Sequence, residues 1–431
     1  MSETPGGIMW ERILCCLAFA FLLVASSAAS TEDHGGEHHS ADHHLHPALN
    51  ESHDVANRSY QRLARINADF AFALYKKLIS QADAKGKNIF FSPLSISMAL
   101  SMLAQGAKDE TQSEIFSTLG YGSLTVDQVN EAYEQLLDVL GHSQDAMLLE
   151  TGGALAVREG FKVVEKFLKD VQHFYHGEAF SVDFSKPEVA AQEVNKYIAK
   201  KTNDVITDMV KSLDPDTVMV LINYIYFRGK WRKPFDVKHT RKASFYVDAK
   251  TKVTVDMMTK TSRYEFYQDQ NNFTSVIMVP YKGNMSMMIV LPDAGKMDEV
   301  EKNIDMESLM YWYKKLSKKR SVKISMPKFS ISASSSLKKI LTEMGINGAF
   351  SDGADFSGIS EEIKLKASKV LHQAVLKVDE KGTEAAGTTT LEMIPMSLPH
   401  TMNLNRPFLV FIVEETNPIV LFMGKITDPT A

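Results

Sequence analysis

Cysteine is almost absent from this chain of 431 residues, and its two copies, Cys15 and Cys16, lie side by side near the N-terminus. They fall in the apolar run 13–25, which a charged pair precedes and small residues follow, as in a secretory signal peptide. At about 13 residues the run is shorter than the ~20 that a membrane span needs. We therefore expect residues 1–30 to be removed and the protein to be secreted, with no membrane association. The mature chain would hold no disulfide and no catalytic thiol.

A large excess of positive or negative charge is also lacking, because 48 Lys and Arg residues nearly balance 53 Asp and Glu residues and leave a net charge of −5. No broad basic field therefore predicts binding to nucleic acid. The sequence contains no Gly-x-Ser-x-Gly elbow, no phosphate-binding glycine loop and no His-Glu-x-x-His motif. We expect a protein that is not an enzyme and that needs no cofactor and no metal.

The segment 31–55 differs in composition from the rest of the chain. It holds seven of the 13 histidines among Asp, Glu and Ser, and too few apolar residues to fold alone. A solvated, disordered arm is the favoured interpretation, and weak binding of Zn or Cu by the clustered imidazoles is the alternative.

One α+β domain is predicted for residues 56–431, because no linker or internal repeat interrupts it. Apolar residues recur at helical spacing from about Arg58, and helical patterns continue to about residue 213. Beyond residue 213, short apolar runs predict strands, and one further short strand is expected just before Pro93. The expected strands and hairpins are 88–92, 218–227, 275–291, 321–326 and 408–423.

Four Asn-x-Ser/Thr sequons are candidate glycosylation sites. They are Asn50, Asn57, Asn272 and Asn284. Asn284 follows Lys282 and Gly283 between two strand-like runs, so we expect it in an exposed turn. Asn57 has an alternative role as a helix cap.

The stretch 380–390 combines glycines with small residues at alternate positions. Thr383, Ala385, Gly387 and Thr389 would all face the same side of a strand, so nothing large would be buried if the segment entered a sheet. Gly and Ala are poor strand formers, which favours a loop that can become a strand. An ordinary flexible loop has the same composition and stays open as the alternative.

Several motifs together resemble the serpin family over residues 56–431. They are GTEAAG at 382–387, LE at 391–392, IPMS at 394–397, NYIYFRGKW at 223–231, PF at 234–235, NRPF at 405–408 and LFMGK at 421–425. The resemblance implies the serpin fold, with an N-terminal helical part, large mixed and antiparallel sheets, and an exposed reactive-centre loop at about 380–400.

The same resemblance implies a mechanism. Met396–Ser397 would be the reactive bond, which a target serine protease cleaves. The protease would become covalently trapped while the hinge of the loop enters the main sheet. The hinge residues are Gly382, Thr383, Ala385 and Gly387. Methionine suits the pocket of an elastase-like or chymotrypsin-like protease. A serpin-fold carrier of a small hydrophobic hormone, which inhibits nothing, is the alternative.

Resemblance also assigns residues beneath and at the end of the main sheet. Ser92, Asn223 and His372 would form the shutter, where strands part, and Trp231 the breach, where insertion begins; ordinary core residues are the alternative interpretation. No Lys or Arg occurs between Lys108 and Arg158, so no heparin requirement is expected. We expect a monomer that polymerises on heating, because a sheet that accepts its own loop can accept a neighbour's.

Overall fold

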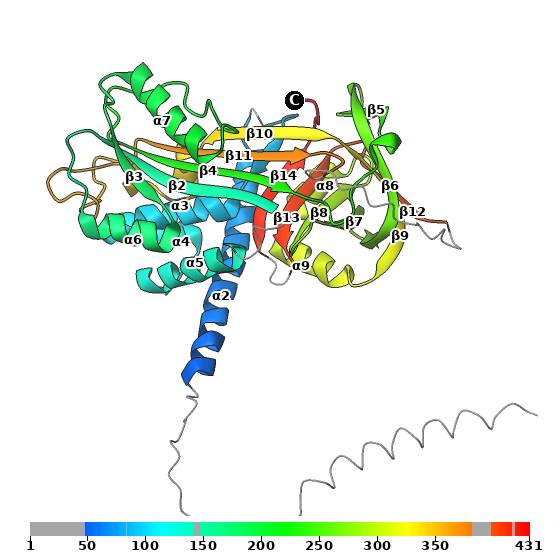
Figure 1. Ribbon diagram of the computed structural model, residues 1–431, viewed down its shortest axis with the longest axis horizontal. Helices are drawn as coiled ribbons and strands as arrows, with labels where there is room; N and C mark the ends of the chain where they lie inside the picture. Colours follow the sequence, from blue (N-terminus) through cyan, green and yellow to red (C-terminus); the bar gives the residue numbers. More distant parts are fainter. Residues whose placement is uncertain (1–47, 83, 142–146, 382–397, 416–418) are drawn as a thin grey trace, which may run out of the picture. The chain divides into compact units, whose positions relative to one another are not determined.

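Helices build the first part of the fold, as the apolar spacing predicts. The computed structural model describes residues 48–82, 84–141, 147–381, 398–415 and 419–431, and residues 51–431 form one unit, separate from residues 1–50 (Figure 1). The helices of this part are α2 (Ala48–Ile79), α3 (Pro93–Gln105), α4 (Asp109–Leu119), α5 (Val126–Gly141) and α6 (Glu165–Tyr175). Helix α3 is buried almost throughout and lies at the centre of the main core.

A five-stranded sheet lies against these helices. Its strand order is β10 (Phe329–Ser336), β11 (Lys369–Val378), β4 (Met219–Gly229), β2 (Met147–Arg158) and β3 (Glu178–Val182). Strand β4 is buried on both faces because its side chains alternate between two cores. Leu221, Ile225 and Phe227 belong to the main core, whereas Ile222 and Tyr224 pack in a second core with helix α7 (Pro187–Lys201).

A nine-stranded sheet forms the other large element (Figure 1). Strands β7 (Thr274–Pro280) and β8 (Met285–Pro292) form a hairpin at its middle, with β13 (Phe408–Glu414) next to β8 and β14 (Val420–Ile426) beyond β13. The order is β1-β14-β13-β8-β7-β6-β9-β12, with β5 paired to β6; the remaining strands are β1 (Ile89–Phe91), β5 (Arg241–Tyr246), β6 (Lys252–Asp269), β9 (Lys319–Pro327) and β12 (His400–Asn403). The remaining helices are α8 (Met297–Asn303), α9 (Met306–Lys315), α10 (Lys338–Met344), η2 (Val237–His239) and η3 (Gly348–Phe350).

The expected strands are confirmed, but the expectation of helical structure up to residue 213 is wrong. Strands β2 and β3 lie within that region. Strand β2 is covered on both faces, so its apolar residues do not alternate and resemble a helix core in sequence. Its Gly152 lies against Tyr224, where an added Cβ would come 2.2 Å from the phenol oxygen. That contact joins residues far apart in the chain, so the local pattern does not reveal it.

The start of α2 also differs from the expected start of the domain. The helix begins at Ala48, inside the segment 31–55 that composition predicted to be an unstructured tail. The rest of that tail and the signal segment 1–30 lie outside the described residues.

Candidate functional site

Strands β4 and β11 lie next to each other and run parallel, which makes their seam unusual in a sheet whose other central pairs are antiparallel. Eight pairs connect them, from Lys369 opposite Val220 to Leu376 opposite Phe227. β11 ends at Val378, immediately before the predicted reactive-centre loop. A segment that turned back from that end would run antiparallel to both strands. The seam can therefore accept one further strand with regular hydrogen bonds on both of its edges.

A buried polar cluster spans this seam from beneath. The Nδ1 atom of His372 on β11 lies 2.6 Å from Oδ1 of Asn223 on β4, directly opposite it. Asn223 also donates through Nδ2 to the carbonyl oxygens of Ser95, at 3.0 Å, and Gly152, at 3.3 Å. One asparagine thus connects β11, β4, β2 and helix α3.

The contacts of His372 define its tautomer. The backbone N–H of Ser92 donates to Nε2 at 3.2 Å, so this nitrogen carries no proton. The proton is therefore on Nδ1, which donates it to Asn223. Complete burial lowers the pKa of His372 to about 3, because charging the ring would remove its solvation without supplying a counter-charge. His372 is neutral at physiological pH.

Ser92 begins the helix on which the cluster rests. Its side chain caps α3 by accepting the N–H of Ser95 at 3.1 Å, and Pro93 follows at the first helical turn. The Ser95 hydroxyl donates to Asn223 Oδ1 at 2.9 Å. The three shutter candidates are thus in direct contact through two hydrogen bonds of His372, with Ser95 as a fourth member that the sequence did not single out.

Trp231 lies just beyond the end of β4 and is bound to the end of β11. Its Nε1 donates to the carbonyl of Asp379 at 2.8 Å, and its ring stacks on Tyr281 with 4.3 Å between centroids. The N–H of Phe235 donates to the carbonyl of Glu380, also at 2.8 Å. The breach candidate therefore holds the backbone that leads into the loop.

The side chain of Glu380 is a further anchor at this point. It is only 6% exposed, and Nζ of Lys328 approaches its Oε2 to 2.9 Å. The hydroxyl of Thr240 donates to Oε1 at 2.8 Å. Burial acts to raise the pKa of Glu380, but the hydrogen bonds from Lys328 and Thr240 outweigh it and the pKa is lowered. Neither Lys328 nor Thr240 stands out in sequence, because each is remote from Glu380 along the chain.

The loop itself lies outside the described residues. This applies to the reactive bond Met396–Ser397 and to the hinge residues Gly382, Thr383, Ala385 and Gly387. The chain is described again from Leu398, whose side chain is 96% exposed, and it enters β12 two residues later. The two described ends thus leave β11 and enter β12, which belong to different sheets.

The sequons differ in their surroundings. Asn284 is exposed in the turn between β7 and β8. Asn272 is also exposed, but its Nδ2 donates to the buried carboxylate of Asp269 at 2.7 Å. Asn50 and Asn57 lie within α2. Among the described residues, no group of three or more His, Cys, Asp or Glu side chains is arranged to hold a metal ion.

Comparisons with known proteins agree with this architecture. The profile of the family described as "Serpin (serine protease inhibitor)" matches residues 65–429. An alpha-1-antitrypsin homolog from Cyprinus carpio is 63% identical over 74% of this chain and 86% of its own length. Alpha-1-antiproteinase S from Cavia porcellus is 38% identical over 100% of this chain and 99% of its own.

Solved structures with the same fold include two human proteins. Human thyroxine-binding globulin, complexed with thyroxine, superposes with a TM-score of 0.82 at 38% identity, covering 86% of this chain and 100% of its own. Human kallistatin gives a TM-score of 0.81 at 38% identity, covering 86% and 99%. From its sequence motifs, its parallel seam and these matches, the chain belongs to the serpin family.

Proposed function

We propose that this serpin inhibits serine endopeptidases of the elastase or chymotrypsin type by acting as a suicide substrate. The protease serine attacks the carbonyl carbon of Met396 and the peptide bond to Ser397 breaks, so that Ser397 takes up a proton as a new amino terminus. The C-terminal segment that it begins stays in the fold, because strands β12, β13 and β14 belong to the nine-stranded sheet. The hinge then enters the seam between β4 and β11 before water can hydrolyse the ester. The relatives named antiproteinase and antitrypsin support this activity.

The parallel seam is the observation that carries the proposal. Inserting a strand breaks one ladder of hydrogen bonds and makes two, so the sheet gains roughly one ladder over the eight positions now paired. At about 1 kcal/mol net for each hydrogen bond, the gain is on the order of 8 kcal/mol. The cluster of Asn223 and His372 lies across the path of the inserting strand and would have to exchange partners.

The residue at the reactive bond determines which proteases attack. Methionine is apolar and unbranched, so it fits a small or hydrophobic specificity pocket. A trypsin-like pocket contains a buried aspartate that methionine would leave unpaired, at a cost of about 3–5 kcal/mol. Elastase-like and chymotrypsin-like proteases are therefore the proposed targets.

A carrier function is the competing hypothesis, since thyroxine-binding globulin shares the fold. One cavity in the described part of the chain, between α8, α9 and the turn before β7, has a volume of about 90 Å³. Pockets for hormone-sized ligands measure about 300–1,000 Å³. This cavity is too small for such a ligand, so it lends no support to a carrier function.

The proposal extends to the location and state of the protein. The signal-like segment 1–30 supports secretion, and exposed Asn284 is the best placed of the sequons to carry a glycan. In the described residues, no helix has the length and apolar character needed to cross a membrane. We expect a monomer that needs no heparin and forms polymers on heating.

Mixing the chain with pancreatic elastase tests the function. We expect a complex that survives boiling in SDS, whereas a carrier would give none. Met396→Arg is the matched variant, because its cation pairs with the aspartate of a trypsin-like pocket and should transfer inhibition to trypsin. Equal inhibition of elastase by both proteins would show that the reactive bond is elsewhere.

A further inference from the structure

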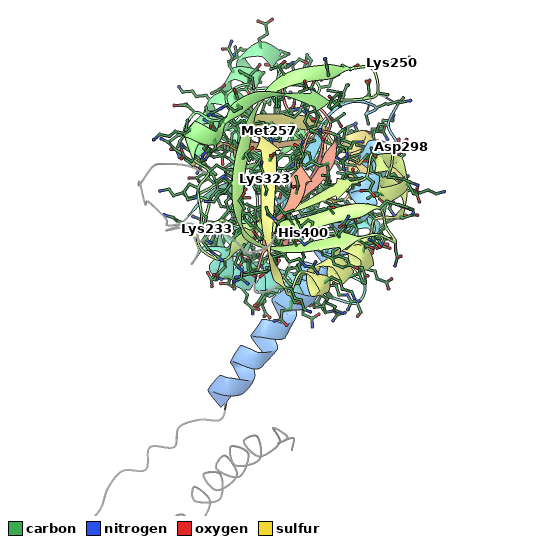
Figure 2. All side chains as sticks on the ribbon, turned by 90° about the vertical axis from the view of Figure 1, so that its right-hand side faces the viewer. Lys233, Lys250, Met257, Asp298, Lys323 and His400 are labelled. Carbon is green, nitrogen blue, oxygen red and sulfur yellow. The ribbon has the colours of Figure 1, made fainter. Side chains whose placement is uncertain are left out.

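The outer face of β6, β9 and β12 begins where the reactive-centre loop ends. Strand β12 follows Leu398 and Pro399 and lies at the edge of the nine-stranded sheet, paired with β9. Figure 2 looks onto this side of the molecule, with Lys323 on β9 and His400 at the start of β12. A protease engaged at residues 396–397 is within two residues of Leu398, so it must lie close to this face.

Two exposed cations, Lys323 and Arg263, occupy this face. Lys323 lies opposite Thr401 on one side and Thr261 on the other, and Arg263 on β6 lies opposite Ser321. Both cations therefore face hydroxyl side chains across the strands rather than carboxylates. Farther along the face, Lys319 lies opposite Glu265, so that cation already has an acidic neighbour.

Strand geometry places both cations within reach of a docked protease. With strands about 4.8 Å apart and a rise of about 3.3 Å per residue, Lys323 is about 11 Å from Leu398. Arg263 is at the same height along the sheet as Pro399 and two strands away from it, a distance of about 10 Å. A typical interface covers about 800 Å² on each partner, a disc of about 16 Å radius. Both positions fall inside such a disc.

We propose that this surface, marked by Arg263 and Lys323, is a docking site for serine proteases that carry carboxylates beside their substrate cleft. The inference rests on the proposed function and adds a second determinant of specificity to the reactive bond. Complementary charges there speed the encounter and orient the protease on the loop. Proteases with a cationic rim are correspondingly slowed.

One protease in two charge states tests the proposal. Pancreatic elastase is compared with the same enzyme after succinylation, which converts its surface amines to carboxylates. The readout is the second-order rate constant for loss of the intact chain, whether it ends in a complex or as cleaved product. At about 0.05 M salt we expect the succinylated enzyme to react roughly tenfold faster, and at about 0.5 M salt the difference should largely disappear.

Charge reversal on the proposed surface should remove that preference. In the variant Arg263→Glu with Lys323→Glu, the rate ratio at low salt should fall to about 1 or below. The matched control is Lys250→Glu with Lys252→Glu, at the far end of the β5–β6 hairpin, where Figure 2 shows Lys250. These positions lie roughly 35 Å from Arg263 along the strand and well beyond the Debye length, so the ratio should persist.

The outcomes separate the two proposals. The docking surface is overturned if the ratio of the two rate constants stays at tenfold in the variant Arg263→Glu with Lys323→Glu. It is also overturned if the ratio falls equally in the control variant. Absence of an SDS-stable complex with either enzyme overturns the inhibitory function instead. The rate constant for cleavage would still report on docking in that case, because a loop attacked as a simple substrate passes through the same encounter.

Discussion

Mild acid should open the seam between β4 and β11 through His372. The ring is neutral and buried, with a pKa lowered to about 3, whereas an opened seam would expose it to water and restore a pKa near 6.5. Between these values the open state binds a proton that the closed state does not. The contribution of His372 to closure is therefore complete above about pH 6.5 and is lost progressively as the pH falls towards 3.

The size of the effect follows from the two pKa values. At about pH 5 the open state gains a factor of about 30 over its population at neutral pH, equivalent to about 2 kcal/mol. In the polymerisation that we propose, an open seam is the state that would accept a neighbour's loop. The rate of polymer formation on gentle heating should therefore rise by about one order of magnitude or more between about pH 7.5 and pH 5.

Native gels of heated samples measure this pH dependence. His372→Gln keeps a polar side chain that does not titrate, so its polymerisation should be much less sensitive to pH, whatever its rate at neutral pH. His239→Gln, which removes an exposed histidine from η2, is the control and should behave as the wild type does. An equal acceleration by acid in the wild type and in His372→Gln would refute the assignment.

Three further predictions concern the loop and the surface. Lys328→Met should lower the free energy of unfolding by about 1–2 kcal/mol, a value discounted for the partial exposure of Lys328, because Thr240 is then the one remaining side-chain partner of Glu380. Thermal melts of a double-mutant cycle with Glu380→Gln should show coupling between the two positions, and simple additivity would contradict the ion pair. Thr383→Arg should raise the number of inhibitor molecules consumed per protease far more than Glu384→Arg, because only the first buries a guanidinium during insertion; equal values would refute the alternation. Asn284→Gln should reduce the mass of the secreted protein by one glycan, and an unchanged mass would exclude that site.

The strands with continuous apolar runs could be predicted from sequence. Strand β4 and the hairpin of β7 and β8 lie where the pattern placed them, because burial on both faces leaves a run that is too short for a core helix. Strand β2 could not be recognised in the same way, because its apolar residues suit a helix core as well and its pair of glycines disfavours helix and strand alike. Its conformation depends on tertiary contacts, such as that between Gly152 and Tyr224.

In the candidate site, too, some residues could be predicted from sequence and others could not. Ser92, Asn223 and His372 were singled out through resemblance, and the structure brings them into contact, although their functional roles are still predictions. Lys328 is one of 48 basic residues, and nothing in its neighbourhood along the chain marks it as the partner of Glu380. Pairings between remote residues arise only when β10 and the end of β11 are placed side by side by the fold.

The mass of the complex formed with pancreatic elastase shows whether the protease is trapped at Met396. If elastase is trapped as an acyl-enzyme at Met396, mass spectrometry under denaturing conditions should find the protease joined to a chain that ends at Met396, and a separate peptide spanning residues 397–431. Insertion should at the same time protect the amides of β4 and β11 from hydrogen exchange. The separate peptide without any covalent complex, or a complex whose chain ends at another residue, would contradict trapping at Met396.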